Sequence, residues 1–271
     1  MELAKKITKK MKKLICIYTC EKDKLSLSKF KSTNLYKSLK QNKNNLLLEV
    51  YADSETSFFE NGKLYLNCKE DYTKLSLKTF KMITDCVTTF EYDVLIKIDC
   101  NVLETDKIYG INTKLKQRVF TENFILNTIN SDYIKNEYGG LVVSYVNNTK
   151  TLKKWGEAKN VKLNFKNKAN FEFPFFCGKF YFLSYDMCEK IIQNGNNELK
   201  FFDDNLGPAE DVFIGYILNC FLNTHTKSKI LNEYQNYIKV NLSEIDMHSV
   251  NTIIHKLNKQ TEFEKEHCIS W

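Results

Sequence analysis

The sequence predicts an α/β fold: one domain with a mostly parallel central sheet flanked by helices. Two observations carry this prediction. Short apolar runs alternate with segments of helical spacing, as expected when parallel strands are joined by crossover helices. The run at residues 92–99 is mostly apolar, as in a strand that helices cover on both faces. The 271 residues include only two prolines and nine glycines, so no linker divides the chain, and its length suffices for one large domain.

The first hundred residues supply this alternation. Strands are predicted at residues 14–18, 46–51 and 92–99, where short β-prone runs end in polar residues. Helices are predicted at 25–39 and 72–90, where apolar side chains recur at helical spacing. The order β-α-β-α-β follows from these five segments.

Beyond residue 110 the pattern is mixed, and a smaller, irregular half is expected. The aromatic-rich segment 171–183 contains Pro174 and Gly178, which predicts a strand or a hairpin. The other elements predicted in this half are a strand at 141–146, helices at 186–193 and 209–221, and strand candidates at 237–240 and 252–254.

Most of the net charge lies near the amino terminus. Six lysines and one glutamate within residues 1–13 contribute +5 of the formal charge of +7, which by subtraction leaves about +2 for residues 14–271. We interpret 1–13 as a basic extension and 14–271 as the folded domain. The extension suits peripheral contact with an anionic membrane. A nucleic-acid binder is the less favoured alternative, because the rest of the chain has no basic surplus.

No stretch of the sequence predicts a membrane anchor. The apolar run 14–18 is far shorter than a signal-peptide core or the roughly 20 residues of a spanning helix. We therefore expect a soluble, cytoplasmic protein. Its nine cysteines include no C-x-x-C pair, which predicts reduced and mostly buried thiols in that compartment.

Three segments carry residue types suited to chemistry. Asp99 and Asn101 follow a predicted buried strand; their oxygens either hold a divalent cation against a diphosphate or belong to a simple turn. Glu210 and Asp211 begin a predicted helix, whose dipole stabilises carboxylates with or without a catalytic role. The aromatic segment around Gly178 forms either a wall for sugar rings or part of the core, with the glycine marking a close approach of backbone or ligand.

Histidines give a weaker signal. The chain has four: His225, His248, His255 and His267. No pair has the spacing of a zinc site on one helix. His255 follows the apolar run 252–254, so at a strand end it would face the same cleft as the acidic residues.

Five motifs occur in the order and approximate spacing of one enzyme family. They are Y-T-K-L-S-L-K-T at 72–79, L-I-K-I-D-C-N-V at 95–102, K-K-W at 153–155, the aromatic segment 173–184 and E-D-V-F-I-G at 210–215. In these motifs the chain resembles the β-1,3-galactosyltransferase and fringe-type glycosyltransferases of family 31. The resemblance covers residues from about 14 to 260.

The resemblance implies a GT-A fold, in which a nucleotide-sugar half with a Rossmann-like sheet packs against a smaller, mixed acceptor half. It also implies inverting transfer of a hexose or N-acetylhexosamine from a UDP-sugar to a hydroxyl of a glycan or glycoconjugate. The expected partners are then that donor and acceptor, without nucleic acid. The sequence predicts no oligomeric state.

The resemblance further implies roles for particular residues. Asp211 matches the general base, and Glu210 beside it is the second catalytic candidate. Further candidates for contacts with the nucleotide sugar are Thr19, Lys78 and Cys100. Candidates for the acceptor pocket are Trp155, Phe176, Gly178 and Tyr181. An exposed helix lysine is the alternative for Lys78, and core packing is the alternative for the aromatic residues.

The metal site implied by the resemblance is altered in this chain. Asp99 matches the first acid of the family's D-D-D motif, and Asn101 matches the third, which usually ligates Mn²⁺. His255, or alternatively His248, resembles a late metal ligand. Because Cys100 and Asn101 replace two acids, we expect weak or dispensable binding of Mn²⁺ or another divalent cation. A degenerate member that binds nucleotide or glycan without turnover is therefore the alternative to an active transferase.

Overall fold

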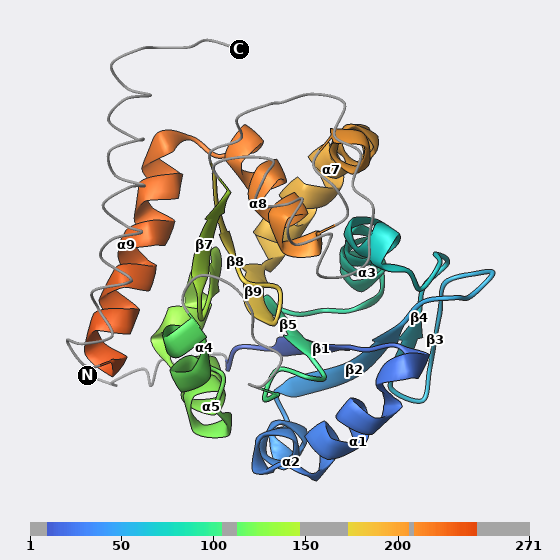
Figure 1. Cartoon of the computed structure of the whole chain (residues 1–271), viewed down its shortest axis with the longest axis horizontal. Coiled ribbons are helices and arrows are strands. Elements are labelled where there is room, and N and C mark those ends of the chain that lie inside the picture. The colour runs from blue at the N-terminus through green and yellow to red at the C-terminus, as the bar shows by residue number, and fades with distance from the viewer. Residues whose placement is uncertain (1–9, 105–112, 147–172, 206–208, 243–271) are drawn as a thin grey trace, which may run out of the picture.

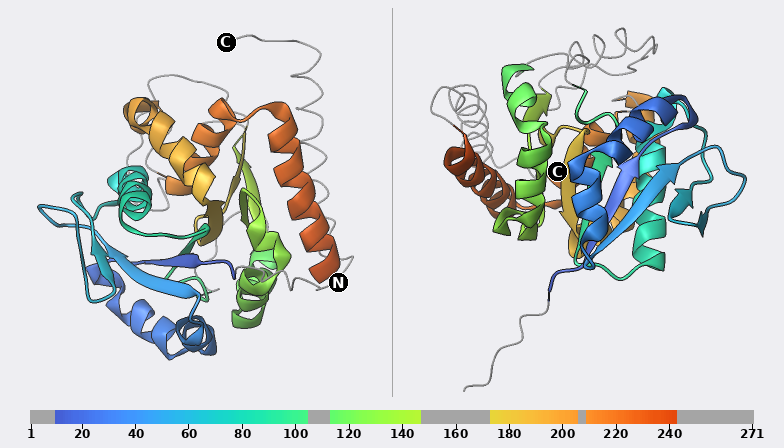
Figure 2. Two further views of the ribbon diagram at one scale, coloured as in Figure 1. Left: turned by 180° about the vertical axis from the view of Figure 1, so that it is seen from behind. Right: turned by 90° about the horizontal axis from the view of Figure 1, so that it is seen from below.

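The computed structural model describes residues 10–104, 113–146, 173–205 and 209–242. Its main feature is a seven-stranded sheet with the strand order β3-β4-β2-β1-β5-β9-β6; a second sheet contains β7 and β8 (Figure 1). Helices lie on both faces of the large sheet in both further views of the molecule (Figure 2). The predicted α/β class is therefore confirmed.

The centre of the sheet is parallel, as predicted. Strand β1 (Lys13–Tyr18) pairs with β2 (Asn45–Tyr51) on one side and with β5 (Val94–Asp99) on the other. In Figure 1, α1 (Lys24–Ser32) and α2 (Asn34–Gln41) lie on one side of these strands, and α3 (Leu75–Thr89) lies on the other. Because helices cover both faces, residues Leu14 to Tyr18 are all buried.

The helix predicted at 25–39 is divided in two. Thr33 has an extended backbone, with φ −70° and ψ 158°, and separates α1 from α2. Its side-chain oxygen accepts a hydrogen bond from the Tyr36 N–H at 3.2 Å, which caps the second helix. The division lets each short helix bury its own apolar side chains.

A short hairpin extends the sheet at one edge. Strands β3 (Phe58–Glu60) and β4 (Lys63–Tyr65) are antiparallel to each other, and β4 is parallel to β2. Asn61 and Gly62 at the tip have φ angles of +49° and +76°, the left-handed conformations that a two-residue hairpin turn requires. These strands were not predicted, because three residues are too few to show an alternating pattern.

The second half makes the sheet mixed. Strand β9 (Phe180–Ser184) runs antiparallel to β5, and β6 (Tyr138–Gly140) runs antiparallel to β9. Strand β8 (Phe173–Phe176) instead pairs with β7 (Val143–Val146) in the small sheet. The aromatic segment predicted as one strand or hairpin is therefore two strands in different sheets, joined by the turn at residues 177–179.

Helices complete this half. They are α4 (Thr113–Val119), α5 (Glu122–Asn130), α7 (Tyr185–Asn205), α8 (Glu210–Phe221) and α9 (Thr224–Asn241), with a short 3₁₀ helix at Asp132–Lys135. Short 3₁₀ helices at Glu21–Asp23 and Tyr72–Lys74 belong to the first half. The strand predicted at 237–240 is wrong, because these residues belong to α9. Tyr234 and Ile238, one helical turn apart, are both fully buried, which is the helical period that a four-residue window conceals. The strand candidate at 252–254 lies outside the described residues.

The amino-terminal boundary lies slightly earlier than predicted. Lys12 Nζ pairs with Glu91 at 2.9 Å, and Lys13, the first residue of β1, bonds to the carbonyl oxygen of Ile129 at 2.7 Å. The last lysines of the predicted extension are thus part of the fold, whereas residues 1–9 lie outside the described part. Within that part, every cysteine is a free thiol, and no helix has the length and hydrophobicity needed to cross a membrane.

Candidate active site

The carboxyl ends of β1 and β5 define the place where a ligand is expected. The chain leaves β1 toward β2 on one side and reaches β5 on the other, and ligands of open α/β sheets bind at such a reversal of strand order. Thr19 directly follows β1, and Asp99 ends β5. The Cys100 N–H donates to the Tyr18 carbonyl oxygen at 3.0 Å, so the two strand ends are joined at this edge.

Lys97 is the centre of the site, although it was not predicted. Its side chain is completely buried. The ammonium donates to Asp99 Oδ1 at 2.5 Å, to Glu210 Oε1 at 3.0 Å and to the Gly178 carbonyl oxygen. Burial alone would lower the pKa of Lys97, but Asp99 and Glu210 outweigh it and raise the pKa above its usual value. This buried cation therefore binds β5 to α8 and to the turn before β9.

Gly178 connects the cation to the predicted base. Its carbonyl oxygen accepts from Lys97, and its N–H donates to Asp211 Oδ2 at 2.8 Å. A Cβ atom here would overlap Glu210 Oε1 and lie 3.3 Å from Asp211 Oδ2. A close approach of backbone or ligand was predicted at this glycine, and the groups that approach it are instead the two side-chain carboxylates of α8.

Asp211 is a carboxyl with a strongly altered acidity. It lies in the first turn of α8, where Oδ2 accepts from the Gly178 N–H and Oδ1 accepts from the Val212 N–H at 2.9 Å. Burial raises the pKa of Asp211 to about 7, and the charge of Glu210 adds to the rise, whereas the Gly178 N–H and Lys97 oppose it. The carboxyl is therefore close to half-ionised at neutral pH, the condition that favours a general base.

Lys78 is buried rather than exposed. Only 1% of its surface is accessible. Its ammonium bonds to Glu70 Oε1 and Oε2 at 2.7 and 2.6 Å and to the Thr19 carbonyl oxygen at 2.7 Å, and it lies 4.4 Å from the centre of the Tyr18 ring. The exposed-lysine alternative is wrong. The ammonium is therefore paired with Glu70 and also holds the backbone at Thr19, directly after β1.

The residues that correspond to the D-D-D motif differ in exposure. Asp99 retains 24% of its side-chain surface, while Cys100 is 4% exposed. Burial raises the pKa of Cys100 to about 12, so it is a neutral thiol and no ligand for a hard cation. The side-chain oxygens of Thr19 and Asn101 are buried and have no hydrogen-bond partner in the described part of the chain. Such orphaned oxygens are available to a bound ligand.

These groups fit a divalent metal poorly. Asp99 is engaged with Lys97, Cys100 is protonated and Asn101 offers a neutral oxygen. The ammonium of Lys179 also lies in this loop, bonded at 3.1 Å to the carbonyl oxygens of Asn101 and Glu104. Across residues 10–104, 113–146, 173–205 and 209–242, no three histidine, cysteine or acidic side chains are grouped to hold a metal ion.

The predicted late ligands cannot be placed at this site. His255 and the alternative His248 lie outside the described residues. The expected Mn²⁺ site therefore stays a prediction.

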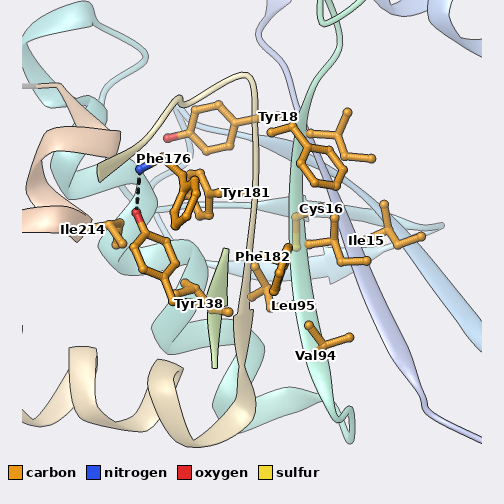
Figure 3. Packing of buried hydrophobic residues seen from close by; sticks show 14 of the residues in the cluster. Ile15, Cys16, Tyr18, Val94, Leu95, Tyr138, Phe176, Tyr181, Phe182 and Ile214 are labelled. Carbon is orange, nitrogen blue, oxygen red and sulfur yellow. Dashed lines mark hydrogen bonds between the residues drawn. The ribbon is translucent and has the colours of Figure 1, made fainter. Parts of the chain in front are cut away.

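The aromatic candidates lie in the core. Phe176 is 1% exposed and Tyr181 is completely buried. Phe176 packs edge-on against Tyr138 with ring centres 4.9 Å apart, and its backbone N–H donates a hydrogen bond to the Tyr138 hydroxyl oxygen at 3.1 Å (Figure 3). The packing alternative therefore holds for these two rings, although Phe176 also lines a small, mostly apolar pocket with Leu218 and Ile230. Trp155 lies outside the described residues.

The sequence is similar to a known protein family. Residues 63–228, more than half of the chain, match the family model described as galactosyltransferase. The matched range contains Lys78, Asp99, Gly178 and both acids of α8. No curated protein matches the chain.

Proposed function

This chain belongs to the galactosyltransferase family, and from that premise we propose that it is an inverting transferase. It moves a hexose or N-acetylhexosamine from a UDP-sugar to a hydroxyl group of a glycan or glycoconjugate. Glycosyl transfer follows from the family. The donor nucleotide, the inverting course and the residues below are our proposal.

The observation that carries the proposal is the state of Asp211. Each carboxylate oxygen accepts one backbone N–H, from Gly178 or Val212, so each retains a further lone pair for an acceptor hydroxyl. Its pKa of about 7 gives substantial base form together with enough basicity to take a proton. An inverting transfer needs a single base of this kind.

The reaction is a single displacement. Asp211 takes the proton of the acceptor hydroxyl as that oxygen forms a bond to C1 of the sugar. The bond from C1 to the diphosphate oxygen breaks, and its electron pair leaves with UDP. Glu210 and Asp99 serve as positioning residues in this scheme, because Lys97 binds both and fixes α8 relative to the end of β5.

Asp211→Asn is the direct test. The substitution keeps the size of the side chain and removes the base, so we expect UDP release from a panel of UDP-sugars with acceptors to fall by about 10²- to 10⁴-fold. UDP affinity should change little. The matched control is Asp132→Asn, which alters an exposed aspartate paired with Lys135 and should leave turnover unchanged.

A catalytically degenerate binder is the second candidate, favoured by Cys100 in place of an acid and by the salt bridge between Lys97 and Asp99. It predicts that UDP or glycan binds to the wild-type protein without transfer under any donor and acceptor combination. Transfer that disappears in Asp211→Asn eliminates this candidate. Transfer that persists at the wild-type rate in that variant eliminates Asp211 as the base.

A further inference from the structure

We propose that Lys179 binds the diphosphate of the donor in place of a divalent cation, so that UDP-sugar binding needs no metal. The inference rests on the proposed function, because it concerns the same donor site. It assigns a role to a lysine of the aromatic segment 173–184 rather than to an acidic residue of the motifs.

The position of Lys179 is the first argument. It lies in the turn at residues 177–179, and its carbonyl oxygen accepts the Asp99 N–H at 3.0 Å. Its side chain then reaches across the loop after β5, where Nζ bonds to the carbonyl oxygens of Asn101 and Glu104. A positive charge therefore lies inside the loop to which the resemblance assigns a metal ion.

The kind of partner that Lys179 has is the second argument. Lys78 and Lys97 are each paired with carboxylates. In contrast, the hydrogen bonds of Lys179 in the described part of the chain go to neutral carbonyl oxygens, which use two of the three ammonium donors. The remaining donor and the charge suit a phosphate oxygen, with which a charge-assisted bond forms.

The charges around the loop are the third argument. Asp99 and Glu104 favour the ammonium form of Lys179, whereas burial and the nearby Lys116 oppose it and lower its pKa. Two acids of the D-D-D pattern are replaced by a buried thiol and an amide, and the remaining carboxylate is paired with Lys97. A divalent cation would meet two ammonium groups here with few anionic ligands. A diphosphate would instead be attracted by both positive charges, with Lys179 as the ammonium that retains a donor for it.

A structural clasp is the competing explanation. Lys179 ties residues 101 and 104 to the turn before β9, and that alone would stabilise the loop. A clasp affects the stability of the protein and the binding of any ligand that contacts the loop. A phosphate contact instead affects UDP and not uridine, which lacks the diphosphate.

The test is calorimetric titration of the full chain with UDP and with uridine, in EDTA and again in excess Mn²⁺. We expect wild-type protein to bind UDP in EDTA, with an affinity that Mn²⁺ changes by less than about threefold. Lys179→Met should weaken UDP binding by about tenfold or more, with uridine binding unchanged. Lys179→Arg should recover most of the UDP affinity. The control Lys135→Met removes an exposed lysine and should bind UDP like the wild type.

Four results overturn the inference. UDP binding that appears only with Mn²⁺ rejects it and leaves the proposed function intact. A Lys179→Met variant that binds UDP normally, or that loses UDP and uridine affinity equally, rejects the phosphate contact. Absence of UDP binding in both EDTA and Mn²⁺ rejects the proposed UDP-sugar donor as well. Circular dichroism and a thermal melt of each variant establish that it is folded before titration.

Discussion

Two buried lysines contact the ring of Tyr18, and they are bound in different ways. Lys78 pairs with Glu70, eight residues away in the sequence, so its ion pair lies within the first half of the chain. Lys97 lies 4.5 Å from the same ring, and Glu210, one of its partners, is 113 residues away. The first ion pair stabilises the donor half alone, whereas the second joins that half to α8.

The comparison shows why a charged side chain is retained inside an apolar strand. Burying a lysine is costly unless hydrogen bonds and opposite charges compensate. The groups that compensate Lys97 lie in three segments that are far apart in the sequence: Asp99 at the end of β5, Gly178 in the turn before β9 and Glu210 in α8. The cation therefore specifies how these segments pack together. At Lys78 the compensating carboxylate is local, and its distant partner, the Thr19 carbonyl oxygen, lies in the same half of the chain.

Removing the two cations should therefore have unequal effects. Lys97→Met leaves Asp99 and Glu210 without their partner, and we expect the free energy of unfolding to fall by about 3–5 kcal/mol. Lys78→Met leaves one carboxylate, of Glu70, whose side chain is 18% exposed, so the loss should be smaller. Urea denaturation of both variants measures the difference. Equal losses would contradict the assembling role of Lys97.

A series of pH values tests the protonation of Asp211, the acid that Lys97 helps to place. Because the pKa of Asp211 is raised from 3.8 to about 7, kcat/KM should level off above pH 7 and fall by about tenfold for each pH unit below it. The same shift makes folding favour the protonated form. The stabilisation that the raised pKa of Asp211 contributes is therefore fully present below about pH 4 and is lost as the pH rises through 7.

The rate profile and a thermal-melt series from pH 4 to 8 check both halves of this prediction. Asp132→Asn should retain the profile. A profile that is flat between pH 5 and 8 would exclude Asp211 as the titrating base.

Of the three substitutions Lys97→Met, Lys78→Met and Gly178→Ala, we expect Gly178→Ala to lower the free energy of unfolding the least. The added methyl group meets Glu210 Oε1, the flexible end of a side chain, and also lies against Asp211 Oδ2. Relief of this overlap needs a shift of Glu210 away from Lys97, for which we expect a loss of about 1–3 kcal/mol. The control is Gly62→Ala at the tip of the β3–β4 hairpin, where φ is +76° but no site residue is near. If both variants lose the same stability but only Gly178→Ala loses turnover, the close contact serves the site.

Much of the donor half could be predicted from the sequence because its signals are local. Strands β1, β2 and β5 are apolar runs between helices, and their parallel order follows from the crossover connections. The β3–β4 hairpin was missed, although Asn61-Gly62 is a strong turn signal. The break at Thr33 was missed because apolar spacing continues across it.

The second half depends on contacts that no local pattern contains. Residues 173–184 form strands in two sheets, which only the pairing with β7 and β5 determines. Asp99, Glu210, Asp211 and Gly178 were predicted as site residues, and the structure brings them together. Lys97 was not, although one lysine between apolar neighbours at 94–98 signals a buried charge. Its partners could not be named, because two of them lie more than 80 residues away.

The peptide groups on either side of Gly178 Cα have a mechanical consequence. Its N–H points to a carboxylate and its carbonyl oxygen to an ammonium, so this short turn solvates an acid and a cation at once. A displacement of the turn would change the geometry of both bonds, because they share one residue. The pKa of Asp211 in α8 and the position of the Lys97 ammonium at β5 therefore change together. A ligand that displaces this turn would alter both.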